Sequence, residues 1–248
     1  MLSLRKILNF YIQSSIHVGI AVFCLVQLSV PQWSGYSFLV LFGTVVGYNF
    51  LKYSEWFLSN KGLRIHLIGI LSVTSIAAAG FLLLFFQQDV AIQLDLTIAL
   101  GLVVLYPFIR KLGWLKPFFV SGVVSYITVV IPLKSSVDVA WFFAQRFLLL
   151  SSVMIPFEIL DSTTDAVAMK TLPHLFGIVR TKQIGYVLVG LFCITSFHTL
   201  SMLYPYFIYA LSSVIAIYFS SQKRSWYYTS FWVESLPILW WLILMVFL

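Results

Sequence analysis

Apolar residues fall into nine long runs along the chain, separated by short polar segments. A run of about 20 apolar residues is the length that an α-helix needs to cross the hydrocarbon core of a bilayer. A helix also satisfies its own backbone hydrogen bonds there. The pattern predicts an all-α, polytopic membrane protein with about nine transmembrane helices in one domain, residues 1–248. The runs cover residues 8–30, 36–58, 64–87, 92–109, 115–133, 137–160, 183–200, 204–221 and 229–248.

The composition agrees with this interpretation. Hydrophobic residues make up 61% of the chain and charged residues 9%, with a mean hydropathy of +0.99, whereas a soluble domain carries about 25% charged residues. The formal net charge is +7, but Lys and Arg occur singly or in pairs between apolar runs. We therefore expect a protein that contacts membrane lipid and has no nucleic-acid partner.

The basic residues indicate the orientation of the chain. With nine crossings, 13 of the 15 Lys and Arg residues fall on one side of the membrane. Loops rich in Lys and Arg stay on the cytoplasmic side. We expect an integral protein of an inner or cytoplasmic membrane, with its N-terminus in the cytoplasm.

Three of the eight acidic residues lie within positions 158–165, at the predicted cytoplasmic end of the sixth helix. Asp161 and Asp165 are four residues apart and share a helix face, and Glu158 lies one turn earlier on the same side. One interpretation is a solvated helix end. The other is a site for Mg²⁺, a cation that prefers oxygen ligands, held by Glu158, Asp161 and Asp165.

Basic residues follow the acidic cluster. We expect residues 166–182 to form a long cytoplasmic connection that carries Lys170, Arg180 and Lys182. Carboxylates for a metal beside cations for an anion are the combination that a diphosphate substrate requires.

Two motifs carry a resemblance to a known family. Asp161-x-x-x-Asp165, followed by K-T-L-P at 170–173 and by Gly177, resembles the second aspartate-rich motif of the UbiA-type intramembrane prenyltransferases. The segment Y-P-F-I-R-K at 106–111 is similar to the family's Y-P-x-x-K-R. The resemblance implies a helical bundle around a cytoplasm-facing cavity. It also implies transfer of an isoprenyl group from an isoprenyl diphosphate to an acceptor, with Mg²⁺ as cofactor.

The resemblance assigns roles to single residues. Asp161 and Asp165 would be catalytic and would hold Mg²⁺ with the help of Glu158. Asn49, at the place of the family's first aspartate-rich motif, would be the third catalytic residue. The candidates for binding the diphosphate substrate are Arg110, Lys111, Lys170, Arg180 and Tyr106.

The first aspartate-rich motif has only a partial counterpart. The family's N-D-x-x-D-x-x-x-D falls on residues 49–57, where Asn49 matches and the three Asp positions hold Phe50, Tyr53 and Phe57. Glu55 is the one carboxylate there, and it is two positions out of register. A shift of two turns a side chain by about 200° around a helix.

Three functions therefore stay open. The first is an active prenyltransferase that uses a single metal cluster. The second is a catalytically degenerate UbiA-like protein that binds an isoprenoid lipid or acts in a membrane assembly. The third is a transporter, for which inverted repeats with helices broken by Gly or Pro would be the signature.

Arg146 and Glu234 are two of the charged residues that fall within the predicted runs. Arg146 is in the sixth run and Glu234 in the ninth. A charge inside a membrane is costly, so such residues face a partner or a functional site. For Arg146 the alternatives are the bundle interior and the outer membrane surface. For Glu234 they are a functional carboxylate and a structural partner of Lys223 or Arg224.

Overall fold

The computed structural model describes residues 4–30, 32–58, 65–165, 169–197 and 203–247, and in these ranges the chain is helical with no strand. The side chains of residues 54–58, 65–66, 203 and 247 are not described, so the expectations for Glu55 and Phe57 lie outside the described residues. The α-helices are α1 (Leu4–Gln13), α2 (Ile16–Gln27), α3 (Gly35–Leu58), α4 (Ile65–Phe85), α5 (Val90–Ile109), α6 (Lys116–Ser125), α7 (Val139–Val153), α8 (Ile155–Asp161), α9 (Leu172–Ser196), α10 (Leu203–Phe219) and α11 (Leu236–Phe247).

Three shorter helices join these elements. A 3₁₀ segment, η1 (Arg110–Leu115), links α5 to α6, and a π-helical segment, η2 (Tyr126–Val130), extends α6. A second π-helical segment, η5 (Tyr228–Val233), precedes α11. Each of the nine predicted apolar runs coincides with one helix or with consecutive helices.

The length and apolar composition of the helices are those of an integral membrane protein. Within the described ranges, five helical stretches are long and apolar enough to cross a membrane, or six if the bent pair α1 and α2 counts as one span. One of the five, Val90–Val130, is 41 residues long and holds two predicted runs. The count of nine crossings stays a prediction.

Two predicted boundaries are wrong. The first run, 8–30, is not one straight helix, because α1 and α2 meet at 59° and Ser15 between them has a left-handed backbone (φ 60°). The connection 166–182 is not a long loop, because α9 begins at Leu172. Thr171 is extended at its N-cap and Pro173 sits in its first turn, where proline is tolerated. Gly177 then breaks the helix with φ 75°.

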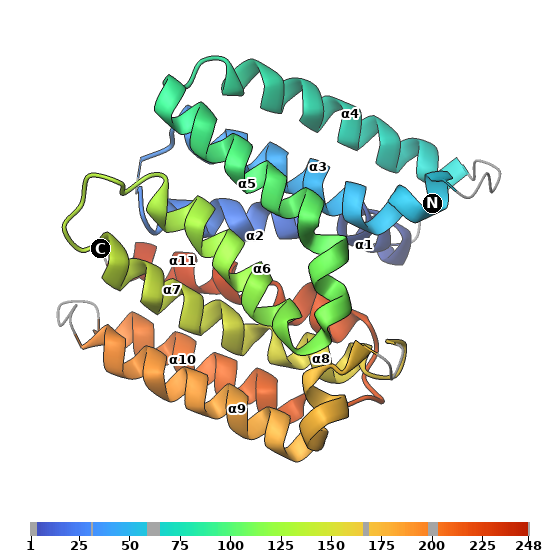
Figure 1. The fold of residues 1–248 in the computed structure, drawn as a ribbon, viewed down its shortest axis with the longest axis vertical. Helices are drawn as coiled ribbons and strands as arrows, with labels where there is room; N and C mark the ends of the chain where they lie inside the picture. The colour runs from blue at the N-terminus through green and yellow to red at the C-terminus, as the bar shows by residue number, and fades with distance from the viewer. Residues whose placement is uncertain (1–3, 31, 59–64, 166–168, 198–202, 248) are drawn as a thin grey trace.

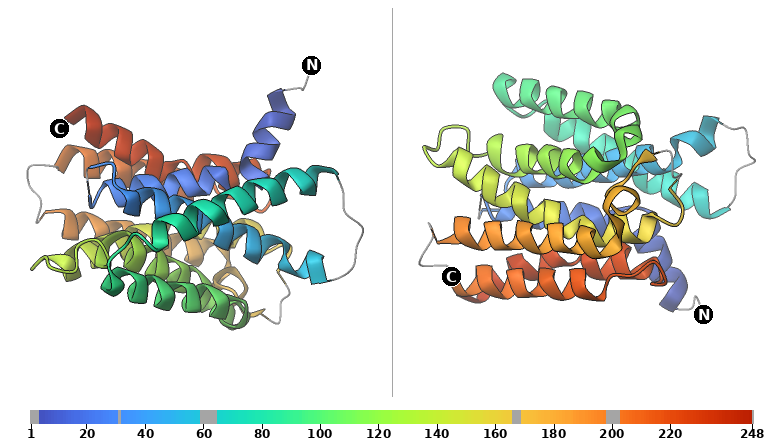
Figure 2. Two further views of the ribbon diagram at one scale, coloured as in Figure 1. Left: turned by 90° about the horizontal axis from the view of Figure 1, so that it is seen from above. Right: turned by 60° about the horizontal axis from the view of Figure 1, so that its bottom comes forward.

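The long helices lie side by side in a bundle (Figure 1). Neighbouring pairs run in the order α4, α3, α2, α11, α10, α9, α7, α6 and α5. The end of α1 points away from the bundle (Figure 2). The largest buried cluster joins α2, α7, α8, α9, α10 and α11 around Trp240, Tyr209 and Phe192.

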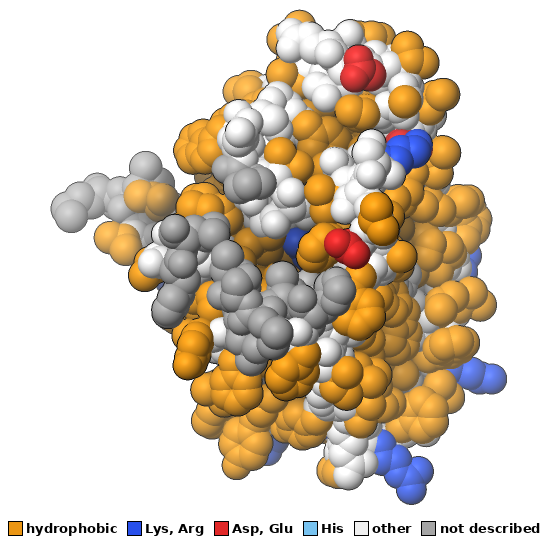
Figure 3. All heavy atoms as spheres, turned by 90° about the vertical axis from the view of Figure 1, so that its left-hand side faces the viewer, with side chains coloured by type: hydrophobic (Ala, Val, Ile, Leu, Met, Phe, Trp, Pro, Cys, Tyr) orange, Lys and Arg blue, Asp and Glu red, His pale blue; other side chains and the backbone are white. Residues whose placement is uncertain are grey.

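Outward-facing helix surfaces are apolar. Large hydrophobic side chains such as Leu83, Val104, Val187 and Phe207 are more than half exposed. Figure 3 looks at the bundle from the left-hand side of Figure 1, where helices end, and hydrophobic side chains are also frequent on that face. Lipid tails are the solvent that such a surface requires.

Candidate functional site

Three carboxylates converge on one ammonium group. Nζ of Lys116 lies 3.2 Å from Oε1 of Glu158, 3.1 Å from Oδ2 of Asp161 and 3.3 Å from Oδ2 of Asp165. Lys116 is the first residue of α6, while Glu158 and Asp161 belong to α8. The two segments are far apart in sequence, and these ion pairs join them. Glu158, Asp161, Asp165, Lys116 and Arg110 are called the charged cluster below.

A second cation closes the cluster. Nη2 of Arg110, at the start of η1, donates to Oδ1 of Asp165 at 3.2 Å. Asp165 therefore holds Lys116 with one oxygen and Arg110 with the other. The five side chains carry three negative and two positive charges, so the charged cluster has a net charge of −1.

The charged cluster is open on one side. The side chains of Glu158, Asp165 and Lys116 are 0%, 4% and 6% exposed, whereas those of Asp161 and Arg110 are 40% and 45% exposed. A ligand can reach Asp161 and Arg110 without unfolding a helix. Glu158 lies at the buried end, and neither of its oxygens has a hydrogen bond of good geometry among the described residues.

The prediction that the three carboxylates share one face is confirmed, although Asp165 lies beyond the end of the helix. Glu158 and Asp161 are in α8, which ends at Asp161, so Asp165 lies beyond the helix. The backbone N–H of Asp165 still donates to the carbonyl of Asp161 at 2.8 Å. This continues the helical turn, and both carboxylates therefore face Lys116.

A glycine lets the chain after the cluster pack against η1. Gly113 has a left-handed backbone (φ 57°), and a Cβ built on it would lie 1.6 Å from the carbonyl oxygen of Met169. No other residue type fits at that distance. Lys170 is itself left-handed (φ 49°), so the turn into α9 is tightly bent where it crosses η1.

His174 fastens the same turn. One ring nitrogen, Nδ1, is 3.0 Å from Oγ1 of Thr171, and the other, Nε2, is 3.1 Å from the carbonyl of Ser162. The amide of Gln222 adds a hydrogen bond to Oγ of Ser162 at 2.8 Å. Through its two ring nitrogens, His174 therefore links Ser162, next to Asp161, to Thr171 at the N-cap of α9.

Tyr106 borders the charged cluster. Its ring stacks on Phe119 with centroids 6.3 Å apart, and its carbonyl accepts a hydrogen bond from the backbone N–H of Arg110. Of the predicted substrate-binding residues, Tyr106 and Arg110 therefore lie with the predicted carboxylates.

The other predicted diphosphate ligands lie apart from the charged cluster. Lys111 points over the ring of Phe108, 5.8 Å from its centroid. Lys170 and Arg180 are exposed. Among the described residues, none of the three cations makes an ion pair with Glu158, Asp161 or Asp165.

Asn49 holds helices together. Its Oδ1 accepts from Oγ of Ser15 at 2.8 Å, and its Nδ2 donates to the carbonyl of Ser14 at 3.0 Å and to Oγ1 of Thr74 at 2.8 Å. Asn49 is 3% exposed. Its amide braces the bend between α1 and α2 against α4, and among the described residues its hydrogen bonds reach Ser14, Ser15 and Thr74 but not the charged cluster.

Lys116 is the member of the charged cluster that the sequence patterns missed. It begins a helix, next to Pro117, and a cation at a helix N-terminus opposes the helix dipole. That unfavourable position is a signal that carboxylates face it. Lys116 lies at the beginning of the fifth run, and the sequence alone gives its position in the chain but not its partners.

The donors fit Mg²⁺ in chemical type, because all three are carboxylates. Their present arrangement suits an ammonium: in the described part of the chain, no group of three or more His, Cys, Asp or Glu is placed to hold a metal ion. A metal bound by these carboxylates would take the position that the ammonium of Lys116 has now.

Comparisons of the chain with models of known families, with curated proteins and with solved structures find no match. The resemblance to UbiA-type prenyltransferases rests on the motifs at 106–111 and 158–177.

Proposed function

We propose that this protein is a UbiA-like membrane prenyltransferase that binds an isoprenyl diphosphate at the charged cluster and transfers the isoprenyl group to an acceptor. The observation that supports it is the gathering of three carboxylates and two cations at one place in an otherwise apolar bundle. The half-exposed Asp161 and Arg110 give a polar headgroup access, and the apolar helices suit the isoprenyl tail.

The residues have distinct roles in this proposal. Arg110 binds the oxygens of the diphosphate, and Tyr106 presents its ring to the allylic carbon, where positive charge develops. Asp161, Asp165 and Glu158 would hold Mg²⁺. The bound metal would neutralise negative charge on the diphosphate.

The reaction is the transfer that these roles permit. The bond between the allylic carbon and the diphosphate oxygen breaks, and its electron pair leaves with the diphosphate. The nucleophilic carbon of the acceptor then forms a bond to the allylic carbon and loses a proton. Apolar surroundings keep water away from the carbocation.

The nine-crossing topology, with the N-terminus and the charged cluster on the cytoplasmic side, belongs to the same proposal. Its support is the distribution of Lys and Arg. On that side a soluble isoprenyl diphosphate would reach Arg110 directly.

The experiment compares membranes that contain wild-type protein, Asp161→Asn or Asp165→Asn, each supplied with Mg²⁺ and a radiolabelled isoprenyl diphosphate. We expect label in a lipid product with the wild type and a loss of at least about 100-fold in both variants, because an interaction that stabilises the transition state is removed. Asp95→Asn is the control, since Asp95 pairs with Lys134, away from the charged cluster. Equal product from all four proteins would overturn the proposal.

A second candidate function is a catalytically degenerate UbiA-like protein that binds an isoprenoid lipid or acts in a membrane assembly. Two observations favour it: the ammonium of Lys116 already occupies the point where the three carboxylates meet, and the amide of Asn49 is committed to holding helices. It predicts that isoprenoid lipid stays bound through purification and that no diphosphate is released with Mg²⁺.

A further inference from the structure

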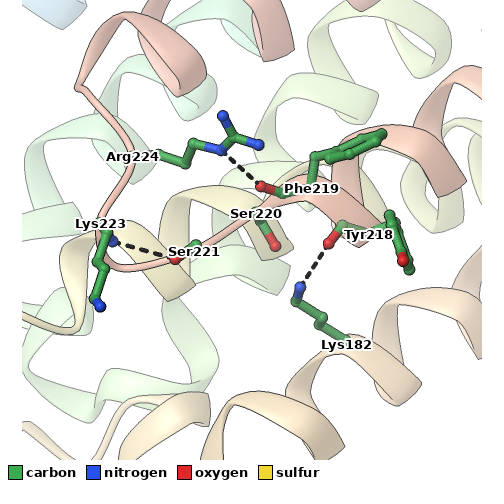
Figure 4. Close-up of a pocket in the computed structure, with 7 residues that line it drawn as sticks. All are labelled: Lys182, Tyr218, Phe219, Ser220, Ser221, Lys223 and Arg224. Atoms are coloured by element: carbon green, nitrogen blue, oxygen red, sulfur yellow. Dashed lines mark hydrogen bonds between the residues drawn. The ribbon is translucent and has the colours of Figure 1, made fainter.

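Three cations line a pocket that includes no residue of the charged cluster. The pocket has a volume of about 640 Å³ and is formed by the start of the long part of α9 and by the segment after α10. Lys182, Lys223 and Arg224 line it together with Tyr218, Phe219, Ser220 and Ser221 (Figure 4). By the predicted topology this pocket faces the cytoplasm.

Two of the cations are held in place by backbone carbonyls. Nζ of Lys182 donates to the carbonyl of Tyr218 at 2.7 Å, and Nε of Arg224 donates to the carbonyl of Phe219 at 3.0 Å (Figure 4). These carbonyls belong to the last turn of α10, which has no intrahelical donors for them. Among the described residues, the two terminal NH₂ groups of Arg224 and two of the three N–H donors of Lys182 make no hydrogen bond.

The pocket is lined by three cations and, in the described part of the chain, by no carboxylate. Among the described residues, none of the ion pairs involves Lys182, Lys223 or Arg224. A guanidinium with free NH₂ groups matches the two oxygens of a phosphate. The chemistry of the pocket therefore suits a phosphate group.

An apolar groove adjoins the pocket. The groove, of about 320 Å³, runs between α10 and the segment formed by η5 and α11, and it shares Phe219 and Arg224 with the pocket. Its other lining residues are mainly apolar or aromatic: Ser212, Ile215, Ala216, Tyr228, Trp232, Val233 and Leu236. The guanidinium of Arg224 lies over the ring of Tyr228, 5.4 Å from its centroid, at the junction of pocket and groove.

We infer that the pocket and the groove together bind one anionic phospholipid of the cytoplasmic leaflet. The phosphate of the headgroup would lie among Lys182, Lys223 and Arg224, and one acyl chain would lie along the groove. Basic pockets between helices at the cytoplasmic surface are a common way of binding anionic lipids. The exposed rings of Trp226 and Trp232, 39% and 66% exposed, are suited to the membrane interface next to that site.

A capping role alone would explain Lys182 and Arg224 but not the adjoining groove. Helix capping requires only the two carbonyl contacts. It gives no preference among lipids and no dependence on the residues that line the groove. Lipid selectivity is therefore the property that separates the two interpretations.

The test is native mass spectrometry of the purified protein with phosphatidylglycerol or phosphatidylcholine added in detergent. The variants are Lys182→Gln and Arg224→Gln, with the matched controls Lys6→Gln and Arg5→Gln. Arg5 and Lys6 are exposed cations of α1 on the same predicted side of the membrane. Ser212→Phe fills the groove and leaves the cations in place.

We expect phosphatidylglycerol to bind more tightly than phosphatidylcholine. Each pocket variant should weaken phosphatidylglycerol binding by about five-fold, the effect of about one charge near a membrane surface, while both controls change it by less than about two-fold. Ser212→Phe should weaken binding of the phospholipid but not that of inorganic phosphate. Equal binding of the two lipids, or equal effects of Arg224→Gln and Arg5→Gln, would overturn the inference. An unchanged affinity of Ser212→Phe for phosphatidylglycerol would show that the groove holds no acyl chain and would overturn the inference that pocket and groove bind one phospholipid together.

Discussion

Nζ of Lys116 lies 3.2 Å from Oε1 of Glu158, and both side chains are almost completely buried. An isolated charge at this depth would be costly, and the pair offsets that cost on both sides. Because Lys116 begins α6 and Glu158 lies within α8, the same pair fixes two helices that the chain connects only through α7.

Removal of the ammonium alone should therefore destabilise the protein. Lys116→Met leaves Glu158 buried without a partner, and we expect the free energy of unfolding to fall by about 3–5 kcal/mol. The double variant Lys116→Met with Glu158→Leu should recover most of that loss. Denaturant titration in detergent micelles, followed by circular dichroism, measures both.

The exposed ion pair of Lys134 and Asp95 supplies the control. Their side chains are 61% and 13% exposed, and Lys134→Met should cost no more than about 1 kcal/mol. A cost for Lys116→Met as small as that for Lys134→Met would contradict a structural role for the buried pair.

Competition between Lys116 and a metal gives a second prediction. Lys116→Gln changes the net charge of the charged cluster from −1 to −2 and empties the point where the carboxylates meet. We expect Mn²⁺, used in place of Mg²⁺, to bind at least about ten-fold more tightly to this variant, because like charges this close interact by more than 1 kcal/mol. Electron paramagnetic resonance of free Mn²⁺ measures the affinity.

Adding Glu158→Gln to Lys116→Gln should reverse that gain, because it returns the net charge to −1 and removes a ligand. Lys134→Gln is the control and should leave Mn²⁺ affinity unchanged. If Lys116→Gln and wild type bind Mn²⁺ equally, the carboxylates do not form a metal site, and the degenerate, lipid-binding function gains support.

The helical segments were predictable from the sequence because each apolar run is about as long as a membrane-crossing helix. The bend at Ser15 and the early start of α9 were not. Ser15 lies inside an apolar run, and its left-handed backbone is held by Asn49, which is 34 residues away. Hydropathy reports how apolar a segment is, whereas a bend depends on such distant hydrogen bonds.

The charged cluster was predictable in part for a similar reason. The spacing of Glu158, Asp161 and Asp165 shows that they share a face, since only local helix geometry is needed. Lys116 is 42 to 49 positions earlier in the chain, and its role depends on how α6 packs beside α8. Lys111 directly follows Arg110, yet its ammonium lies over the ring of Phe108 and not at the carboxylates.

Gly113 gives a third prediction. Gly113→Ala forces Cβ to within 1.6 Å of the carbonyl oxygen of Met169 and strains a left-handed backbone, which alone costs about 1–3 kcal/mol. We expect lower thermal stability and faster proteolysis in the segment around Met169, mapped by limited trypsin digestion at Lys170.

Gly101→Ala is the matched control, because a Cβ at Gly101 meets no atom within 4 Å. Alanine in place of a helical glycine should stabilise the protein by about 0.5–1 kcal/mol. Equal digestion at Lys170 in the two variants would show that the segment does not depend on its contact with η1.

Arg146 provides the last prediction. Of the two alternatives for this residue, the bundle interior and the outer membrane surface, the first is correct. The structure places Arg146 inside the bundle, 5% exposed. Its Nη1 donates to the carbonyl of Leu25 at 2.6 Å and to Oγ1 of Thr128 at 3.3 Å, and its guanidinium lies over the ring of Trp240, 5.3 Å from the centroid. Arg146→Lys keeps the charge but loses the planar fork that makes these contacts together. We expect a loss of about 1.5–3 kcal/mol in the free energy of unfolding, the worth of a hydrogen bond to a charged group.

Arg180→Lys, at an exposed position of α9, is the control and should change stability by less than about 0.5 kcal/mol. Thermal unfolding in detergent compares the two, and a lysine tolerated equally well at both positions would show that charge alone, and not the geometry of the guanidinium, holds α7 against α2.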